Sequence, residues 1–203
     1  SISVSEKRLP QFLGHHEIRH EHVLANKEPG VITGLAWTAA GGEILFIETS
    51  LAPGKGNLII TGQLGDVMKE SARIALSLVK HMYPEEAAKL EDHDLHIHVP
   101  AGAVPKDGPS AGITLTTALA SLLTGKSVSP EFAMTGEVSL TGRVMPIGGL
   151  PEKLMAAERA GVKTVFIPKE NEEDLEEVAK EVREKLTILP VEKVTDVLEK
   201  VLQ

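Results

Sequence analysis

Residues 96–112 read HIHVPAGAVPKDGPSAG, and the character of the chain changes twice within this stretch. Residues 95–99 alternate apolar side chains with histidine, which is typical of a half-buried strand. Residues 100–109 are rich in glycine and proline and predict a loop. Residues 110–123 are strongly apolar and predict a buried helix. The stretch therefore predicts a strand, a loop and a helix, with Ser110 at the point where the helix begins.

Strand-like and helix-like segments interleave along the rest of the chain. Two pairs of β-branched runs are joined by the turns Gly41-Gly42 and Thr141-Gly142, which predicts two hairpins. Asp66 is expected to cap the first long helix. This order predicts an α/β or α+β sandwich with a mixed sheet and packed helices. The expected strands are 31–39, 43–49, 58–61, 95–99, 132–140, 143–146, 164–167 and 187–189, and the expected helices are 66–82, 110–123, 151–161, 172–185 and 196–202.

Ser110 is a candidate nucleophile. It lies in Gly108-Pro109-Ser110-Ala111-Gly112, which fits the pattern Gly-x-Ser-x-Gly. Small neighbours let another backbone approach the serine, and free N–H groups at a helix N-terminus stabilise an oxyanion. On this pattern alone, a serine that caps a glycine-flanked helix is the better interpretation. The nucleophile hypothesis therefore depends on finding a base.

Histidine is the first base to consider. All eight histidines lie at or before His98. An α/β-hydrolase needs its histidine after the nucleophile, so that class is excluded. A triad with His96 or His98 as the base, oriented by Asp94 or Asp107, stays open.

Lys153 is the other candidate base. An ordinary lysine, with a pKa of ~10.4, is protonated at neutral pH, so it acts as a base only where it is desolvated or near positive potential. Lys153 follows Pro151 in the first turn of an expected helix, beside the positive end of the helix dipole. Leu150, Leu154 and Met155 are apolar neighbours that exclude water. The pattern by itself still favours a surface lysine at a helix start.

Composition excludes several other functions. The net charge is −8 and no basic stripe is present, so the sequence does not favour a nucleic-acid partner. The absence of cysteine excludes thiol catalysis, and no His-Glu-x-x-His string supports a metal site. Gly125-Lys126-Ser127 resembles the end of a P-loop, but the first glycine is missing, so no nucleotide site is expected. No apolar run approaches the ~20 residues that span a membrane.

Two long motifs resemble those of the Lon protease family. Residues 96–112 resemble its nucleophile segment, and residues 134–153, MTGEVSLTGRVMPIGGLPEK, resemble its lysine segment. The resemblance runs from about Gly30 to Gln203. Shorter matches are GLAW at 34–37, IET at 47–49, PGKG at 53–56 and VMKES at 67–71.

The resemblance implies the Lon-type α+β peptidase fold and an ATP-dependent serine endopeptidase of the endopeptidase La type, which degrades unfolded, damaged or regulatory proteins. Residues 1–28 would be a connector or the tail of a preceding AAA+ ATPase module, and residues 29–203 the proteolytic domain. ATP and Mg²⁺ would serve that module, and the domain itself would need no cofactor and no metal. The partners would be unfolded polypeptides and further copies of the chain in a hexameric ring, with no membrane. The implied location is the bacterial cytoplasm, with the mitochondrial matrix as the alternative.

By matching positions, Ser110 would be the nucleophile, Lys153 the base, and Thr135 the hydrogen-bond partner of the lysine amine. Asp107, Glu48 and His98 would be supporting residues nearby. Asp107 would also be able to form a salt bridge with Lys153 and hold the site inactive. A non-catalytic ring module that kept the fold is the alternative function.

The chain departs from the family pattern at four places. Ala101 stands where Glu is common, Ala39-Ala40 where a Glu-Val type pair is usual, Thr141 where Arg is frequent, and Pro151 where Lys is frequent. None of these is a member of the serine–lysine pair, so they put substrate preference, ring contacts and pH response in question rather than the reaction.

Overall fold

The structure is a computed structural model that describes residues 27–38, 41–101 and 105–203. The connector expected at residues 1–28 therefore lies almost wholly outside the described residues. The strands are β1 (Val31–Thr38), β2 (Gly41–Pro53), β3 (Leu58–Thr61), β4 (His93–His98), β5 (Phe132–Met134), β6 (Glu137–Val138), β7 (Val144–Met145), β8 (Thr164–Pro168) and β9 (Thr187–Val191). The α-helices are α2 (Asp66–Met82), α3 (Gly112–Thr124), α4 (Leu150–Arg159), α5 (Lys180–Lys185) and α6 (Val194–Val201), with 3₁₀ helices η2 (Glu86–Glu91) and η3 (Lys169–Glu177).

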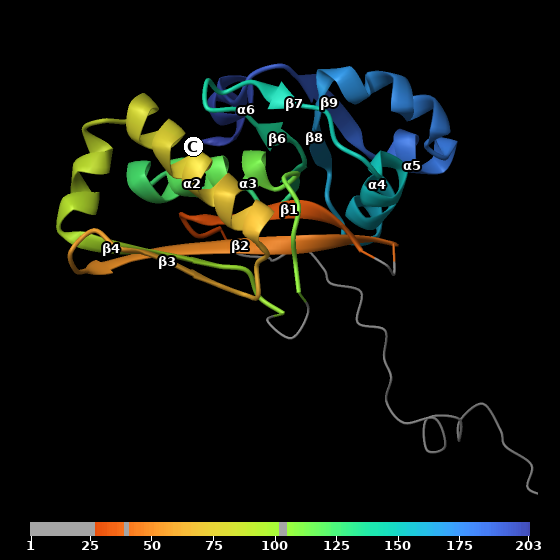
Figure 1. Cartoon of the computed structure of the whole chain (residues 1–203). Helices are drawn as coiled ribbons and strands as arrows, with labels where there is room; N and C mark the ends of the chain where they lie inside the picture. Colours follow the sequence, from red (N-terminus) through yellow and green to blue (C-terminus); the bar gives the residue numbers. More distant parts are fainter. Residues whose placement is uncertain (1–26, 39–40, 102–104) are drawn as a thin grey trace, which may run out of the picture.

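A seven-stranded mixed sheet forms the centre of the molecule, with the strand order β3-β4-β2-β1-β5-β8-β9. The hairpin strands β1 and β2 are antiparallel, and β1 also pairs in parallel with β5. The strands β5, β8 and β9 continue in parallel. The mixed sheet with packed helices confirms the predicted α+β class (Figure 1).

Helices cover the two faces of the sheet and divide the core in two. Phe166 of β8 packs in the core beneath α2, α3 and α6, whereas its neighbours Val165 and Ile167 pack in the core beneath α4. This alternation follows from the period of two along a strand. In Figure 1, α2 and α3 lie over one half of the sheet, and α4 and α5 lie at its other end.

The N-termini of α3 and α4 converge where β5 ends. The N–H of Ile113 in α3 donates to the carbonyl of Gly136 at 3.0 Å, and the amine of Lys153 in α4 donates to Thr135 at 3.3 Å. Thr135 and Gly136 are the two residues that follow β5. Ligand sites in α/β sheets form at the carboxyl ends of strands where neighbouring helices diverge to opposite faces, so this edge is the place to look for a site.

Two expected elements are each divided into two in the structure. The strand expected at 132–140 is two strands, because β5 ends at Met134 and β6 pairs with β7 in a separate two-stranded sheet. Thr135 and Gly136 leave the strand path to bind β8 and the Ser110 turn. The helix expected at 172–185 is the 3₁₀ helix η3 followed, after an extended Val178, by α5.

The cap predicted for α2 is wrong. Gly65 is the N-cap residue and Asp66 is the first helical residue, and no side chain of the N-cap closes the helix. The carboxylate of Asp107 instead accepts from the N–H of Met68 at 2.9 Å. The free N–H group at the helix start is satisfied by a residue from a distant loop rather than by its own neighbour.

Candidate active site

Lys153 is a buried lysine in the first turn of α4. Its exposed fraction is 2%, and its amine donates to the Thr135 hydroxyl oxygen at 3.3 Å. Gly149, in the left-handed conformation with φ of 71°, begins the helix, and its carbonyl accepts from the Lys153 N–H at 3.0 Å. Burial lowers the pKa of Lys153 from its ordinary value of 10.5 to about 8, because desolvation penalises the charged amine. At pH 7 roughly a tenth of the amine is then neutral, and about half of it is neutral at pH 8.

Thr135 is fully buried, and a hydrogen bond of its backbone N–H fixes its position. Its N–H donates to the carbonyl of Phe166 in β8 at 3.1 Å. Its hydroxyl is therefore held at one place beside the lysine. A hydroxyl oxygen accepts a hydrogen bond from a neutral or a charged amine, so Thr135 orients Lys153 without demanding a charge on it.

Ser110 lies in the turn directly before α3 and is partly buried. Its carbonyl accepts from the N–H of Gly136 at 2.9 Å. Gly112 packs so closely on the next segment that a Cβ there would lie 2.9 Å from the backbone nitrogen of Val138. The glycine after Ser110 is thus required for close backbone approach, as the Gly-x-Ser-x-Gly pattern predicts.

Residues of both long motifs line one cavity. It has a volume of about 710 Å³, and both Ser110 and Lys153 line it. No hydrogen bond between the Ser110 hydroxyl and the Lys153 amine is present in the described part of the chain. The remaining lining residues come from β1, β2, α2, the loop before Ser110 and the loop before α4: Ala36, Trp37, Thr38, Glu43, Leu45, Met68, Pro105, Lys106, Asp107, Gly108, Pro109, Ala111, Pro146, Ile147 and Gly148.

Comparison with known proteins gives this site a family. Residues 3–203 match the Lon protease (S16) C-terminal proteolytic domain. The chain belongs to this family. It is 57% identical over 201 residues to the Lon protease of Clostridium beijerinckii, and 55% identical over 196 residues to that of Methanosarcina barkeri. It is also 53% identical over 201 residues to Lon protease 1 of Bacillus subtilis.

The matches cover nearly all of this chain but only a part of each relative. The match to the Clostridium beijerinckii protein covers 99% of this chain and 25% of that relative. For the Methanosarcina barkeri protein the shares are 96% and 24%, and for the Bacillus subtilis protein they are 98% and 26%. The chain therefore spans about a quarter of the length of these Lon proteases. What is shown is the proteolytic domain of a Lon-type serine peptidase.

Asp107 of this Lon domain lies on the cavity wall but binds α2. Backbone N–H groups of Met68, Gly108 and Val67 lower the pKa of its carboxyl group. No ion pair joins Asp107 to Lys153 among the described residues. Gly65 leaves room for the carboxylate, because a Cβ at that position would collide with it. In this conformation Asp107 anchors the loop before Ser110 and forms no ion pair with Lys153.

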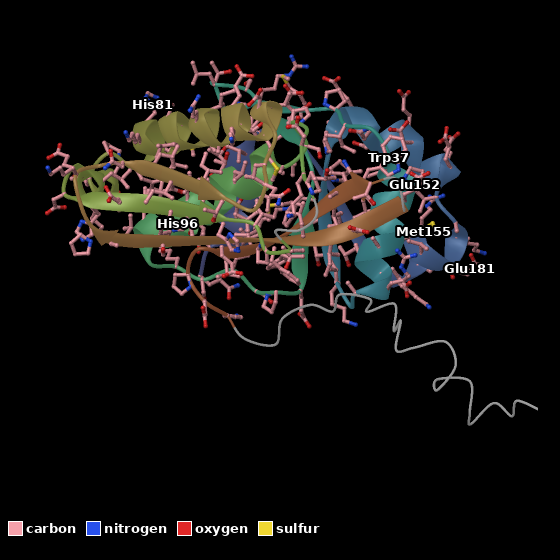
Figure 2. All side chains as sticks on the ribbon, turned by 60° about the horizontal axis from the view of Figure 1, so that its bottom comes forward. Trp37, His81, His96, Glu152, Met155 and Glu181 are labelled. Atoms are coloured by element: carbon pink, nitrogen blue, oxygen red, sulfur yellow. The ribbon has the colours of Figure 1, made fainter. Side chains whose placement is uncertain are left out.

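Glu48 and His98 lie together, but away from the cavity. They face each other in the register of β2 and β4, and neither lines the cavity. His98 Nδ1 and His96 Nε2 both lie within hydrogen-bond distance of the Thr61 hydroxyl, at 2.7 and 2.8 Å. Figure 2 shows His96 on the half of the sheet remote from Trp37, a cavity residue. The geometry thus gives no support to a histidine base for Ser110.

Asn171 is a supporting residue that sequence reasoning missed. It is buried, and its side-chain amide binds both backbone groups of Ile147, accepting from the N–H at 3.0 Å and donating to the carbonyl at 2.9 Å. It thereby fixes the loop that leads into α4. Acidic residues flank it in the sequence, and such a run gives no sign of a buried amide.

No group of three or more histidine, aspartate or glutamate side chains suited to a metal ion occurs in the portion of the chain that the structure describes. Within the same portion, no helix is long and apolar enough to cross a membrane.

Proposed function

We propose that this domain hydrolyses peptide bonds through an acyl-enzyme on Ser110, with Lys153 as the general base. The observation that carries the proposal is the buried amine of Lys153, whose pKa is about 8, in the same cavity as the serine. A base is most effective when its pKa lies near the working pH. A surface lysine, which the sequence pattern by itself favoured, would not meet this condition.

The reaction has two halves, formation and hydrolysis of the acyl-enzyme, and each half includes two proton transfers. The Ser110 hydroxyl oxygen attacks the carbonyl carbon of the substrate while its proton passes to the neutral Lys153 amine. The resulting ammonium then protonates the departing amine as the peptide bond breaks, which leaves the acyl-enzyme. Water then attacks the acyl carbon while Lys153 takes its proton. The ester bond to the Ser110 oxygen breaks, that oxygen receives the proton from Lys153, and the carboxyl product leaves.

The oxyanion of each tetrahedral intermediate needs positive potential nearby. The helix α3 has 13 residues and begins at Gly112, two positions after Ser110. Its N-terminus places the positive end of the helix dipole at that point. In the open cavity the serine and the lysine are not yet hydrogen-bonded, and we expect the bound substrate to bring them together, as is common for catalytic groups in empty sites.

The cavity favours a polypeptide with an apolar side chain next to the cut. Its wall includes Ala36, Leu45, Met68 and Ile147, and burial of an apolar substrate group there stabilises the complex. Unfolded polypeptides present such side chains freely. We therefore propose unfolded or damaged proteins as the substrates.

For the whole protein we propose the organisation that the family resemblance implies. Residues 29–203 would be the proteolytic domain, and residues 1–28 a connector to an AAA+ module that uses ATP and Mg²⁺. The active form would be a hexameric ring in the bacterial cytoplasm, or alternatively in the mitochondrial matrix. Mass measurement of the purified protein tests the ring.

A fluorophosphonate probe, which modifies activated serines, tests the proposed reaction. We expect one adduct per chain on the peptide that contains Ser110, together with hydrolysis of unfolded casein. Ser110→Ala should remove both and leave the circular dichroism spectrum unchanged. Ser50→Ala, an exposed serine of β2, is the matched control and should keep both. Appreciable turnover by folded Ser110→Ala would reject the nucleophile, and a wild-type chain without turnover would favour a non-catalytic module.

A further inference from the structure

Trp37 and Gly42 of the β1–β2 hairpin pack against the first turn of α4, the turn that carries Lys153. Trp37 and Gly42 are directly opposed partners in the register of the hairpin. Opposed residues of an antiparallel pair present their side-chain positions on the same face. Here that face meets α4, and Figure 2 shows Trp37 and Glu152 close together at this end of the molecule.

Gly42 touches the peptide unit that joins Glu152 to Lys153. A Cβ on Gly42 would collide with the Glu152 carbonyl group and would lie 2.9 Å from the Lys153 backbone nitrogen. The helix backbone therefore rests on the hairpin backbone with no side chain between them. Arg159, at the end of the same helix, donates to the carbonyl of Gly42 at 3.2 Å, which ties α4 to this residue a second time.

Trp37 covers the residue that starts the helix. A Cβ on Gly149 would lie 2.9 to 3.1 Å from three atoms of the indole ring, so the ring lies directly against this glycine. The carbonyl of the same Gly149 accepts from the Lys153 N–H at 3.0 Å, so the residue that the ring contacts also makes the hydrogen bond that opens α4. The Trp37 side chain is 62% exposed, so it contributes little to the core. The ring instead lies against Gly149 and lines the cavity that Lys153 also lines.

We propose that Trp37 and Gly42 are positioning residues for Lys153, which fix the first turn of α4 and so set the depth at which its amine is buried beside Thr135. The proposal rests on the serine–lysine function proposed above. Neither residue belongs to the two long motifs, and neither has a group that could take part in the proton transfers. They act through the backbone of α4.

The pKa of Lys153 is the quantity that reports on this role. Glu43 of β2 and Lys106 and Asp107 of the loop before Ser110 line the same cavity, and Glu152 precedes Lys153 on α4. Burial is nevertheless the only cause of the lowered pKa of Lys153. Moving the first turn of α4 outward would hydrate the amine and return its pKa toward 10.5.

The test uses Gly42→Ala, Trp37→Ala and Trp37→Phe in this chain, with a small fluorophosphonate as the probe. The rate of Ser110 modification is measured from pH 6 to pH 10, together with kcat and KM for a peptide substrate. At pH 7.5 we expect Gly42→Ala to slow modification by about 10- to 100-fold, the effect of a displacement of roughly 1 Å. Its apparent pKa should move upward. Trp37→Ala should show the same shift to a smaller extent, and Trp37→Phe should restore the wild-type profile.

Leu140→Ala is the matched control for Trp37→Ala. Leu140 is also a large exposed apolar residue near a hairpin tip, but it does not line the cavity. Its removal should leave the pH profile unchanged. If Gly42→Ala does not fold, Trp37→Ala decides, since its side chain is mostly exposed.

Two outcomes contradict the proposal in distinguishable ways. Folded Trp37→Ala and Gly42→Ala with wild-type pH profiles and only a raised KM would show that these residues touch substrate and do not position Lys153. A wild-type chain that does not react with the probe at any pH would instead reject the serine–lysine function, and the positioning role with it.

Discussion

The amine of Lys153 donates to the hydroxyl oxygen of Thr135 at 3.3 Å, although 18 residues separate the two along the chain. Both side chains are almost wholly buried, and no salt bridge of the described residues includes Lys153. Burial without a counter-ion penalises the charged amine and so lowers its pKa. Its pKa of about 8 follows from this arrangement.

Lys153→Arg tests whether the amine must lose its proton. The guanidinium keeps the positive charge but cannot be deprotonated in a protein, so it cannot serve as a base. We expect peptide hydrolysis to fall by at least about 100-fold, the contribution typical of a general base. In the wild type, kcat/KM should rise with pH through about 8, as Lys153 deprotonates. His98→Gln is the control and should retain activity, and the opposite pattern would restore a histidine base.

Lys153→Met tests the cost of burying the lysine. The folded-state pKa is about 8 and the unfolded value is about 10.5, so between these pH values the unfolded chain binds more protons and wild-type stability rises with pH. Below pH 8 the full cost of about 3 kcal/mol is present, partly offset by about 1 kcal/mol from the hydrogen bond to Thr135. Lys153→Met should therefore be more stable than wild type by about 2 kcal/mol at pH 7. Urea unfolding at pH 7 to 10 checks this, and a difference that does not shrink toward pH 10 would contradict it.

Thr135→Val removes the hydroxyl and keeps the shape of the side chain. The amine then has no acceptor in its buried site and loses its orientation. We expect kcat to fall by about 10- to 100-fold, as for a misplaced catalytic group, with KM little changed because Thr135 does not line the cavity. Thr135→Ser, which keeps the hydroxyl, should recover most of the activity. Equal losses in both variants would mean that packing, rather than the hydrogen bond, is what matters.

Asp107→Ala tests the anchor between the nucleophile loop and α2. Removal of the carboxylate leaves the Met68 N–H without its partner and frees the loop before Ser110, so both the melting temperature and kcat/KM should fall at pH 7. The folded-state pKa of Asp107 is lowered from 3.8, so its stabilising effect is present above that value and disappears as the pH falls through the folded pKa. The melting temperatures of variant and wild type should therefore converge in strong acid. Asp66→Ala is the control, because Asp66 makes no cap hydrogen bond, and a larger loss in that variant would restore the cap predicted from the sequence.

The sequence by itself determined the succession of elements and the two motifs. Alternation of apolar residues marked the strand before the nucleophile loop, and the turn at Thr141-Gly142 correctly joined β6 to β7. Local patterns of this kind depend on a few neighbouring residues, so they can be found without a structure. The positions of Ser110 and Lys153 within their motifs also came from the sequence.

Only the tertiary structure decided which of these residues share an environment. Lys153 is buried because α4 packs on β1 and β2, and its pKa is a consequence of that packing rather than of its neighbours in sequence. Asp107 caps α2 because folding brings it beside Met68, and His98 lies on another part of the sheet because of the register of β4. Desolvation, hydrogen bonding and charge act over a few ångströms in space, and residues far apart in the chain reach that distance only once the sheet has formed.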